Sequence, residues 1–245
     1  MSPKIILVEH GDGVIELRLN RPEVHNAIDP EMAQNICDEL VRGKLTNAKS
    51  IILSGEGSSF CSGADQNWFK ARALEHQNNG RPYQLRDELL TLSNLYYLLN
   101  KQTCPKIGVA HGSVYGGGIG LLCCCDLVYA APHTIFYLSE LSIGLVPAII
   151  SPYLKHKLGE QVARKLALTS DFFNARHAGL VDLQLYDLDQ ARTLAIKKGR
   201  ELGGNDAFAQ TKLIFGGKCD DGSFLDRDQR CGLLEASIMA KDWSK

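Results

Sequence analysis

Two short segments near the start of the chain, residues 4–9 and 14–19, are rich in Ile, Leu and Val, and in the second of them polar residues alternate with apolar ones after residue 15. Such short segments are typical of β-strands, and the Gly-Asp-Gly sequence at 11–13 is typical of a hairpin turn. Helical periodicity then begins after Asp29 and Pro30, a pair in which the aspartate can cap the helix and the proline can occupy its first position. The pattern therefore predicts a hairpin followed by a helix that ends near residue 41.

Further along the chain, short apolar runs that indicate buried strands alternate with longer segments of helical periodicity. Strands are predicted at residues 51–53, 106–110, 127–130 and 135–137, and helices at 68–76, 85–99 and 118–125. A polar stretch at 77–82 predicts an exposed break between two helices, and the pattern after Pro147 is mostly helical apart from an extended segment at 181–185. This order predicts an α/β fold, with a core over residues 1–190 and a helical C-terminal region over 191–245.

The composition is that of a globular protein and excludes several classes of function. Of the 245 residues, 44% are hydrophobic and 22% are charged, and the net charge is -1. These values exclude a disordered or coiled-coil chain and provide no basic surface for nucleic acid. The longest apolar run, residues 143–150, is much shorter than the ~20 residues of a membrane-spanning helix, and no secretory signal pattern is present. We therefore expect a cytoplasmic protein that binds neither nucleic acid nor membranes.

Cysteine is abundant, with eight residues in the chain. They include three in succession at 123–125, but no C-x-x-C pair. This spacing matches neither a zinc site nor a disulfide framework. We expect reduced thiols that pack as small hydrophobic side chains, and no metal site.

Two loops that follow predicted strands carry most of the candidate chemistry, residues 60–65 and 111–118. Glycines there allow the backbone to approach a ligand, and two amide N–H groups from different loops could stabilise one oxyanion. The alternative is that the glycines only allow a helix to pack closely on the sheet. The spacing excludes a dinucleotide fingerprint, a phosphate-binding loop and a nucleophile elbow. We therefore interpret His111 as a packing residue at the end of a strand.

A single acidic residue, Glu140, interrupts an apolar stretch that runs from residue 135 to 147. Burial would raise the pKa of its carboxyl group towards the range that is useful for proton transfer. The alternative is a partly exposed glutamate at the end of a strand. Both interpretations remain open from the residues alone.

Five motifs together resemble the crotonase (enoyl-CoA hydratase/isomerase) superfamily, in its order and at about its spacings. They are Leu19-Asn20-Arg21-Pro22-Glu23 with Asn26-Ala27, Phe60-Cys61-Ser62-Gly63-Ala64-Asp65, Gly116-Gly117-Gly118, Cys125-Asp126 and Ser139-Glu140. The resemblance implies a crotonase-like spiral of ββα turns with a helical C-terminal trimerisation region, and a homotrimer or dimer of trimers. It also implies that acyl thioesters bind, with coenzyme A or phosphopantetheine as the substrate handle and no other cofactor.

The resemblance also assigns roles to individual residues. The amides of Ala64 and Gly117 are expected to form the oxyanion hole, and Glu140 is expected to be the acid/base. The backbone near Val24, Ala27 and residues 62–65 is expected to hold the adenine end of coenzyme A. The full set of expected substrate contacts from these motifs is Ser62, Asp65, Gly116, Gly118, Gly120, Val24 and Ala27.

Two stretches, residues 65–68 and 138–153, are most similar to those of bacterial 3-methylglutaconyl-CoA hydratases and of the dehydratases of polyketide β-branching. This similarity implies a lyase that interconverts 3-hydroxy-3-methylglutaryl and 3-methylglutaconyl thioesters, on coenzyme A or on an acyl carrier protein. Hydratases with two glutamates carry one of them where this chain has Gly120. The single glutamate leaves open a Δ3–Δ2 enoyl-CoA isomerase, or a member that binds acyl thioesters without catalysis.

A 3-methylglutaconyl group carries a free carboxylate, which would need a cation or another hydrogen-bond donor in the acyl pocket. The segment after the first loop supplies Arg81, Arg86 and Tyr83 as candidates, as well as Lys70 and Arg72. Arginine is favoured over lysine because its planar guanidinium binds a carboxylate through two parallel hydrogen bonds.

Overall fold

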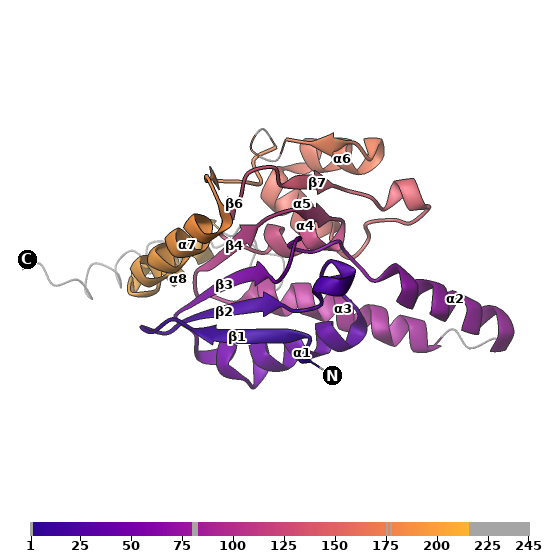
Figure 1. Ribbon diagram of the computed structural model, residues 1–245, viewed down its shortest axis with the longest axis horizontal. Helices are drawn as coiled ribbons and strands as arrows, with labels where there is room; N and C mark the ends of the chain where they lie inside the picture. The colour runs from indigo at the N-terminus through magenta and orange to yellow at the C-terminus, as the bar shows by residue number, and fades with distance from the viewer. Residues whose placement is uncertain (1, 80–82, 175, 177, 216–245) are drawn as a thin grey trace, which may run out of the picture.

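The computed structural model describes residues 2–79, 83–174, 176 and 178–215. The strands are β1 (Ile5–Glu9), β2 (Val14–Leu19), β3 (Ser50–Gly55), β4 (Lys106–Ala110), β5 (Ser113–Tyr115), β6 (Leu127–Ala130), β7 (Ile135–Tyr137), β8 (Phe172–Phe173) and β9 (Leu183–Gln184). The α-helices are α1 (Pro30–Val41), α2 (Gln66–Asn79), α3 (Tyr83–Lys101), α4 (Gly117–Cys123), α5 (Ser151–Leu158), α6 (Glu160–Thr169), α7 (Leu188–Gly203) and α8 (Ala207–Phe215). Figure 1 shows their arrangement.

The larger sheet has the strand order β1-β2-β3-β4-β6-β9. Only the β1–β2 pair of this sheet is antiparallel, and the pairs from β2 to β9 are parallel. A smaller sheet contains β5, β7 and β8. The carboxyl ends of parallel strands meet at one edge of a sheet, and loops that follow them are the usual position of ligand sites. Both candidate loops follow such strands, β3 and β4.

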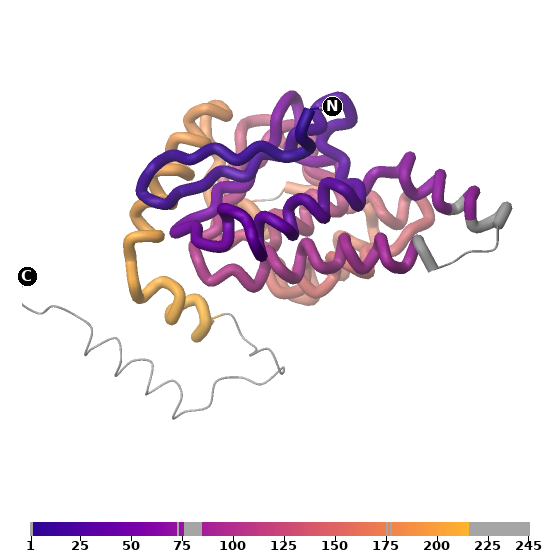
Figure 2. Tube along the Cα trace, turned by 90° about the horizontal axis from the view of Figure 1, so that it is seen from below, coloured from indigo at the N-terminus to yellow at the C-terminus, as the bar shows by residue number. Residues whose placement is uncertain are grey.

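Helices cover both faces of the larger sheet because alternate side chains of its strands point to opposite faces. In β3, Ile51 and Leu53 belong to the main core with α1, α3 and α4, whereas Ile52 packs with Ala191 and Ala195 of α7. Figures 1 and 2 both show the α2–α3 pair projecting from one end of the molecule, with α7 and α8 at the opposite end. This projecting pair forms one wall of the site described below.

The hairpin, the first helix and the strands at 106–110, 127–130 and 135–137 are confirmed as predicted. The predicted break is wrong at residues 77–79, which continue α2, while residues 80–82 lie outside the described part of the chain. Glu88 of α3 accepts hydrogen bonds from Trp68 and Arg72, which hold the first two turns of α2 against α3. The backbone then continues as a helix through residue 79 in spite of the weak helix propensity of its asparagines.

Two short strands were not predicted, β5 and β8. Each has only two or three residues and is defined by pairing with β7, which contributes Phe136 opposite Phe173 and Tyr137 opposite Phe172. The Tyr137 and Phe172 rings stack with their centroids 4.7 Å apart. Such pairing across the sequence leaves no periodicity in so short a segment, so the pattern alone could not show it.

The cysteines of the described chain, six of the eight, are free thiols. Burial raises the pKa of Cys61, Cys123 and Cys125 to about 12, so these groups remain protonated and unreactive at neutral pH. Among the described residues, no group of three or more His, Cys, Asp or Glu side chains is placed to hold a metal ion. The described helices include none that is both long enough and apolar enough to cross a membrane.

Asp187 caps the N-terminus of α7, and its replacement tests how much this cap stabilises the protein. The Asp187 side chain accepts a hydrogen bond from the Gln190 amide at 2.7 Å. We expect Asp187→Ala to lower the free energy of unfolding by about 1 kcal/mol, because the amide loses its partner. Asp189→Ala in the same turn is the matched control, since Asp189 is exposed and does not cap the helix. Equal midpoints of urea unfolding for the two variants would contradict the capping role.

Candidate active site

A cavity of about 540 Å³ lies between α3, the loop after β3, the start of α4 and the segment after β7. Its walls are mostly apolar. The lining residues are Ser62, Gly63, Ala64, Gln66, Phe69, Leu85, Arg86, Leu89, Leu90, Leu92, Ser93, Tyr96, Gly116, Gly117, Ser139, Glu140, Ile143 and 145–150. Among these described lining residues, Arg86 and Glu140 carry the formal charges. The cavity therefore resembles an apolar acyl pocket with one carboxylate and one guanidinium.

The amides of Ala64 and Gly117 border the same small space at the end of this cavity. A Cβ atom built on Gly117 would lie 3.5 Å from the amide nitrogen of Ala64, and one built on Gly63 would lie 3.3 Å from the amide nitrogen of Gly117. Neither N–H group donates a backbone hydrogen bond within the described chain. Two amide donors directed at one oxygen would stabilise an oxyanion, and that Ala64 and Gly117 do so stays a prediction.

Glu140 lies beside this pair of amides, at the start of the short helix Leu141–Ile143 that follows β7. A Cβ atom on Gly116 would lie 2.7 Å from the Oε1 atom of Glu140, so the carboxyl group sits against the backbone of the glycine cluster. Oε2 is buried and has no hydrogen-bond partner in the described structure. Burial raises the pKa of the Glu140 carboxyl above its ordinary value. A carboxyl group of this kind can accept and return a proton near neutral pH.

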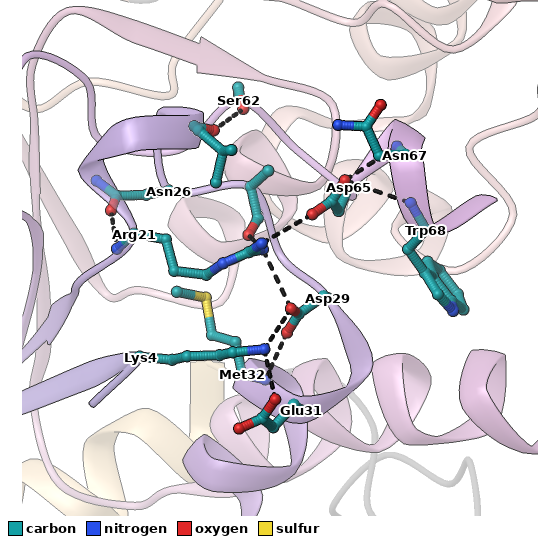
Figure 3. Close-up of polar contacts among 12 residues, drawn as sticks. Lys4, Arg21, Asn26, Asp29, Glu31, Met32, Ser62, Asp65, Asn67 and Trp68 are labelled. Carbon is teal, nitrogen blue, oxygen red and sulfur yellow. Dashed lines mark hydrogen bonds and ion pairs between the residues drawn. The ribbon is translucent and has the colours of Figure 1, made fainter. Parts of the chain in front are cut away.

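The loop with Ala64 is held in place by a network that starts at Arg21 (Figure 3). The Nη2 atom of Arg21 lies 3.0 Å from Oδ2 of Asp65, and Oδ1 of Asp65 accepts a hydrogen bond from the Asn67 amide at the start of α2. The backbone of Ile28 bonds to both sides of Ala64, through the carbonyl of Gly63 and the amide of Asp65. Arg21 is part of a motif in the sequence, but its positioning role is visible only in the structure.

The two backbone stretches that are expected to hold adenine, near Val24–Ala27 and at residues 62–65, lie side by side. Ser62 donates through its amide to the His25 carbonyl and through its hydroxyl to the Val24 carbonyl, and the Ala27 carbonyl accepts a hydrogen bond from Arg21. Both carboxylate oxygens of Asp65 are engaged by the protein, so its side chain acts within the loop. That this surface binds coenzyme A stays a prediction.

The candidates for binding a substrate carboxylate separate clearly. Arg86 lines the cavity near its rim, where its side chain is exposed. Arg72 is bonded to Glu88 and Glu75, and Lys70 is absent from the lining. Arg81 lies outside the described residues, as does the side chain of Tyr83. His111 is buried and contacts the Gly57 carbonyl through Nε2 at 3.0 Å, consistent with a packing residue.

Comparison with known proteins shows the family to which the chain belongs. The sequence model of the enoyl-CoA hydratase/isomerase family matches residues 9–243. This chain belongs to that family. It is 31% identical over 161 residues to the enoyl-CoA hydratase ACTT6 of Alternaria alternata, and the match spans 64% of this chain and 50% of that protein. It is 28% identical over 207 residues to the hydroxycinnamoyl-CoA hydratase-lyase of Pseudomonas fluorescens, covering 81% of this chain and 72% of the relative.

The fold is also that of the family. An enoyl-CoA hydratase from Shewanella pealeana superposes with a TM-score of 0.81 at 28% identity, covering 98% of this chain and 89% of that one. The crotonase-like α/β fold is therefore confirmed. The domain boundary at residue 190 and the trimer stay predictions.

Gly118 and Gly120 do not contribute to the cavity, in contrast to what the motif implied. A Cβ atom on Gly118 would lie 2.5 Å from the Cys61 carbonyl oxygen, and one on Gly120 would lie 2.5 Å from Cγ2 of Ile150 and 3.0 Å from Cε1 of Tyr96. For these two glycines the close-packing interpretation holds. In this enoyl-CoA hydratase/isomerase family member, Ile150 and Tyr96 fill the space beside Gly120 that the side chain of a second glutamate would need. Neither residue was among the predicted site residues.

The packing at Gly120 gives a second prediction. In an open helix Gly→Ala is stabilising, but here we expect Gly120→Ala to lower the free energy of unfolding by about 1–3 kcal/mol, the cost of overpacking. Ile150→Ala removes the obstructing methyl group, so Gly120→Ala should cost less when it is made in that background. Chemical unfolding of the four proteins of this double-mutant cycle measures the difference. A stabilising Gly120→Ala in the parent chain would show that the first turn of α4 has room.

Proposed function

We propose that this protein is an acyl-thioester hydratase/dehydratase that interconverts 3-hydroxyacyl and 2-enoyl thioesters. The observation that supports the proposal most directly is the position of Glu140, whose carboxyl group has one oxygen without a partner in the described structure and lies beside the amides of Ala64 and Gly117 in an apolar cavity. The thioester carbonyl would accept from the amides of Ala64 and Gly117, which favours enolate character at that oxygen.

One carboxylate can balance the reaction in this arrangement. In the dehydration direction, Glu140 takes the proton from C2, and the C–H electron pair moves into the enolate held by the two amides. The enolate then forms the C2–C3 double bond and the C3–O bond breaks, while Glu140 returns its proton to the departing hydroxyl group. The products are the 2-enoyl thioester and water, and the enzyme regains its starting protonation state.

For the acyl group we propose the 3-hydroxy-3-methylglutaryl/3-methylglutaconyl pair, on coenzyme A or on a carrier protein. Arg86 supports this choice, because it is the cation among the described lining residues and a terminal carboxylate needs such a partner. Its position near the rim agrees with a charged group at the far end of an acyl chain whose reacting carbons lie near Glu140.

A second candidate is a Δ3–Δ2 enoyl-CoA isomerase, and the packing around Gly120 favours it. With Ile150 and Tyr96 in the place of a second carboxylate, Glu140 would take a proton from C2 and return it to C4.

The ultraviolet absorbance of conjugated enoyl thioesters separates the candidates. Hydration of 3-methylglutaconyl-CoA removes the absorbance, isomerisation of a 3-enoyl-CoA creates it, and a non-catalytic binding protein changes neither.

Replacement of Glu140 tests its role as the acid/base. We expect Glu140→Gln to lower kcat about 10²–10⁴-fold, the usual contribution of such a group. In the parent enzyme, kcat/KM should fall with decreasing pH at a pH above the ordinary carboxyl range, because burial raises the pKa of Glu140. Retention of near-parental rates by Glu140→Gln on enoyl and 3-hydroxyacyl substrates would contradict the assignment.

Stability provides a control for the same variant. The folded state binds the Glu140 proton more tightly than the unfolded state, because the folded pKa is raised. Ionisation of the buried carboxyl group therefore lowers the free energy of unfolding: the loss is absent below the unfolded pKa and complete above the folded pKa. Glu140→Gln should therefore unfold at a higher temperature than the parent at neutral pH, and the gain should disappear at acidic pH. An inactive variant that is more stable at neutral pH has lost chemistry and not its fold.

Arg86 gives a test of the acyl class. Because Arg86 is exposed, we expect Arg86→Ala to lower kcat/KM for 3-methylglutaconyl-CoA about fivefold, the effect of a solvent-accessible ion pair of about 1 kcal/mol. Crotonyl-CoA, whose acyl group carries no charge, should be unaffected. Lys70→Ala is the matched control, because Lys70 is an exposed cation on the neighbouring helix that does not line the cavity. Equal losses on both substrates would redirect the proposal to a simple enoyl chain.

A further inference from the structure

Tyr96 of α3 makes a contact with the oxyanion loop that the function above does not use. Its hydroxyl group donates a hydrogen bond to the carbonyl oxygen of Gly117 at 3.0 Å. Tyr96 is 2% exposed, so loss of this hydrogen bond would leave a largely buried polar group without its protein partner. Gly117 therefore provides the expected oxyanion donor through its amide, while its carbonyl is held by Tyr96.

The backbone around Gly117 is shaped to receive the tyrosine. A Cβ atom on Gly117 would lie 2.7 Å from the Tyr96 hydroxyl oxygen, so the hydroxyl occupies the space where another residue would have a side chain. On the other side, Gly116 has a φ of 42° and a ψ of -111°, a conformation that favours glycine, and its amide donates to the Tyr137 carbonyl. The peptide unit that carries the Gly117 N–H therefore lies between two peptide units that are held: the preceding one by Tyr137 of β7, and the following one by Tyr96 of α3.

Helix α3 also carries part of the acyl pocket. Leu89, Leu92 and Ser93 line the cavity from the turns that precede Tyr96. The Tyr96 side chain packs against the first turn of α4, over Gly117 and Gly120. One helix therefore contacts both the acyl chain and the backbone that is expected to hold the thioester oxygen.

We propose that Tyr96 is a positioning residue: its hydrogen bond to the Gly117 carbonyl restrains backbone rotation at Gly117 and so helps to orient the amide donor of the same residue. The proposal rests on the proposed function only in that a thioester carbonyl occupies the space between the two amides. Tyr96 acts through Gly117 and takes no proton from the substrate. Burial raises the pKa of its phenol well above the ordinary value, so the hydroxyl remains a donor throughout the working pH range.

Tyr96→Phe removes the hydroxyl and keeps the ring that fills the space over Gly120. We expect kcat to fall about tenfold, as for the loss of one hydrogen bond, with KM changed by less than about twofold because coenzyme A contacts are untouched. The pH at which kcat/KM falls should stay where the parent has it, since Glu140 keeps its surroundings.

A spectroscopic measurement separates positioning from mere structural support. Butyryl-CoA labelled with ¹³C at the thioester carbonyl has no double bond and cannot be hydrated or isomerised. We expect its carbonyl stretching frequency to drop on binding to the parent protein, because hydrogen bonds polarise the bond, and to drop less on binding to Tyr96→Phe. Tyr97→Phe is the matched control, since Tyr97 is 48% exposed on the same helix and does not line the cavity.

The outcomes of the two measurements are distinguishable. If Tyr96→Phe is less stable but binds butyryl-CoA with the parental frequency and keeps the parental kcat, the hydroxyl is structural only and the proposal is overturned. If the parent turns over no enoyl or 3-hydroxyacyl thioester, yet Tyr96→Phe weakens the frequency change, the proposed reaction fails and the positioning role stands. An unchanged frequency in the parent protein itself would overturn the positioning role, because no donor then acts on the carbonyl.

Discussion

The close approach of two backbone segments, residues 61–65 and 114–118, is the constraint on which the rest of the site depends. The Tyr115 amide donates to the Cys61 carbonyl at 3.0 Å, and the same carbonyl oxygen lies where Gly118 would carry a Cβ atom. Any side chain at Gly118 would push the segments apart. This backbone contact brings the amides of Ala64 and Gly117 to the same end of the cavity, so the packing of the glycine cluster and the proposed oxyanion hole depend on the same close approach.

Charge is distributed around this contact in two different ways. Asp65 is largely buried but has both oxygens engaged, by Arg21 and by the start of α2, so its charge is compensated and holds the loop in place. Glu140 is also largely withdrawn from water but has one oxygen without a partner in the described structure. A carboxylate whose charge is compensated by hydrogen bonds and a cation stabilises the structure. A buried carboxyl group without such partners has a raised pKa, which makes it suitable for proton transfer.

The fold of the family leaves the rest of the cavity to be shaped by individual side chains. Ile150 and Tyr96 pack against Gly120 in the first turn of α4, and most of the side chains that line the cavity belong to α3 and to the segment after β7. Because one backbone contact can support several reactions of acyl thioesters, the choice among them depends on these local side chains. The position of a single carboxylate in this cavity is therefore more informative about the chemistry than the fold is.

Elements with a strong local signal could be predicted from the amino-acid sequence: the hairpin, the capped helix α1, the buried parallel strands, and the family, through contiguous motifs. The same motifs named Ala64, Gly117 and Glu140, which the structure places on one cavity and whose roles stay predictions. The three-dimensional structure was needed to show which glycines line the cavity, and that Arg21, Tyr96 and Ile150 contact the loops and helix around it. Each of these depends on a contact between segments far apart in sequence, and such contacts have no periodicity or spacing from which they could be predicted.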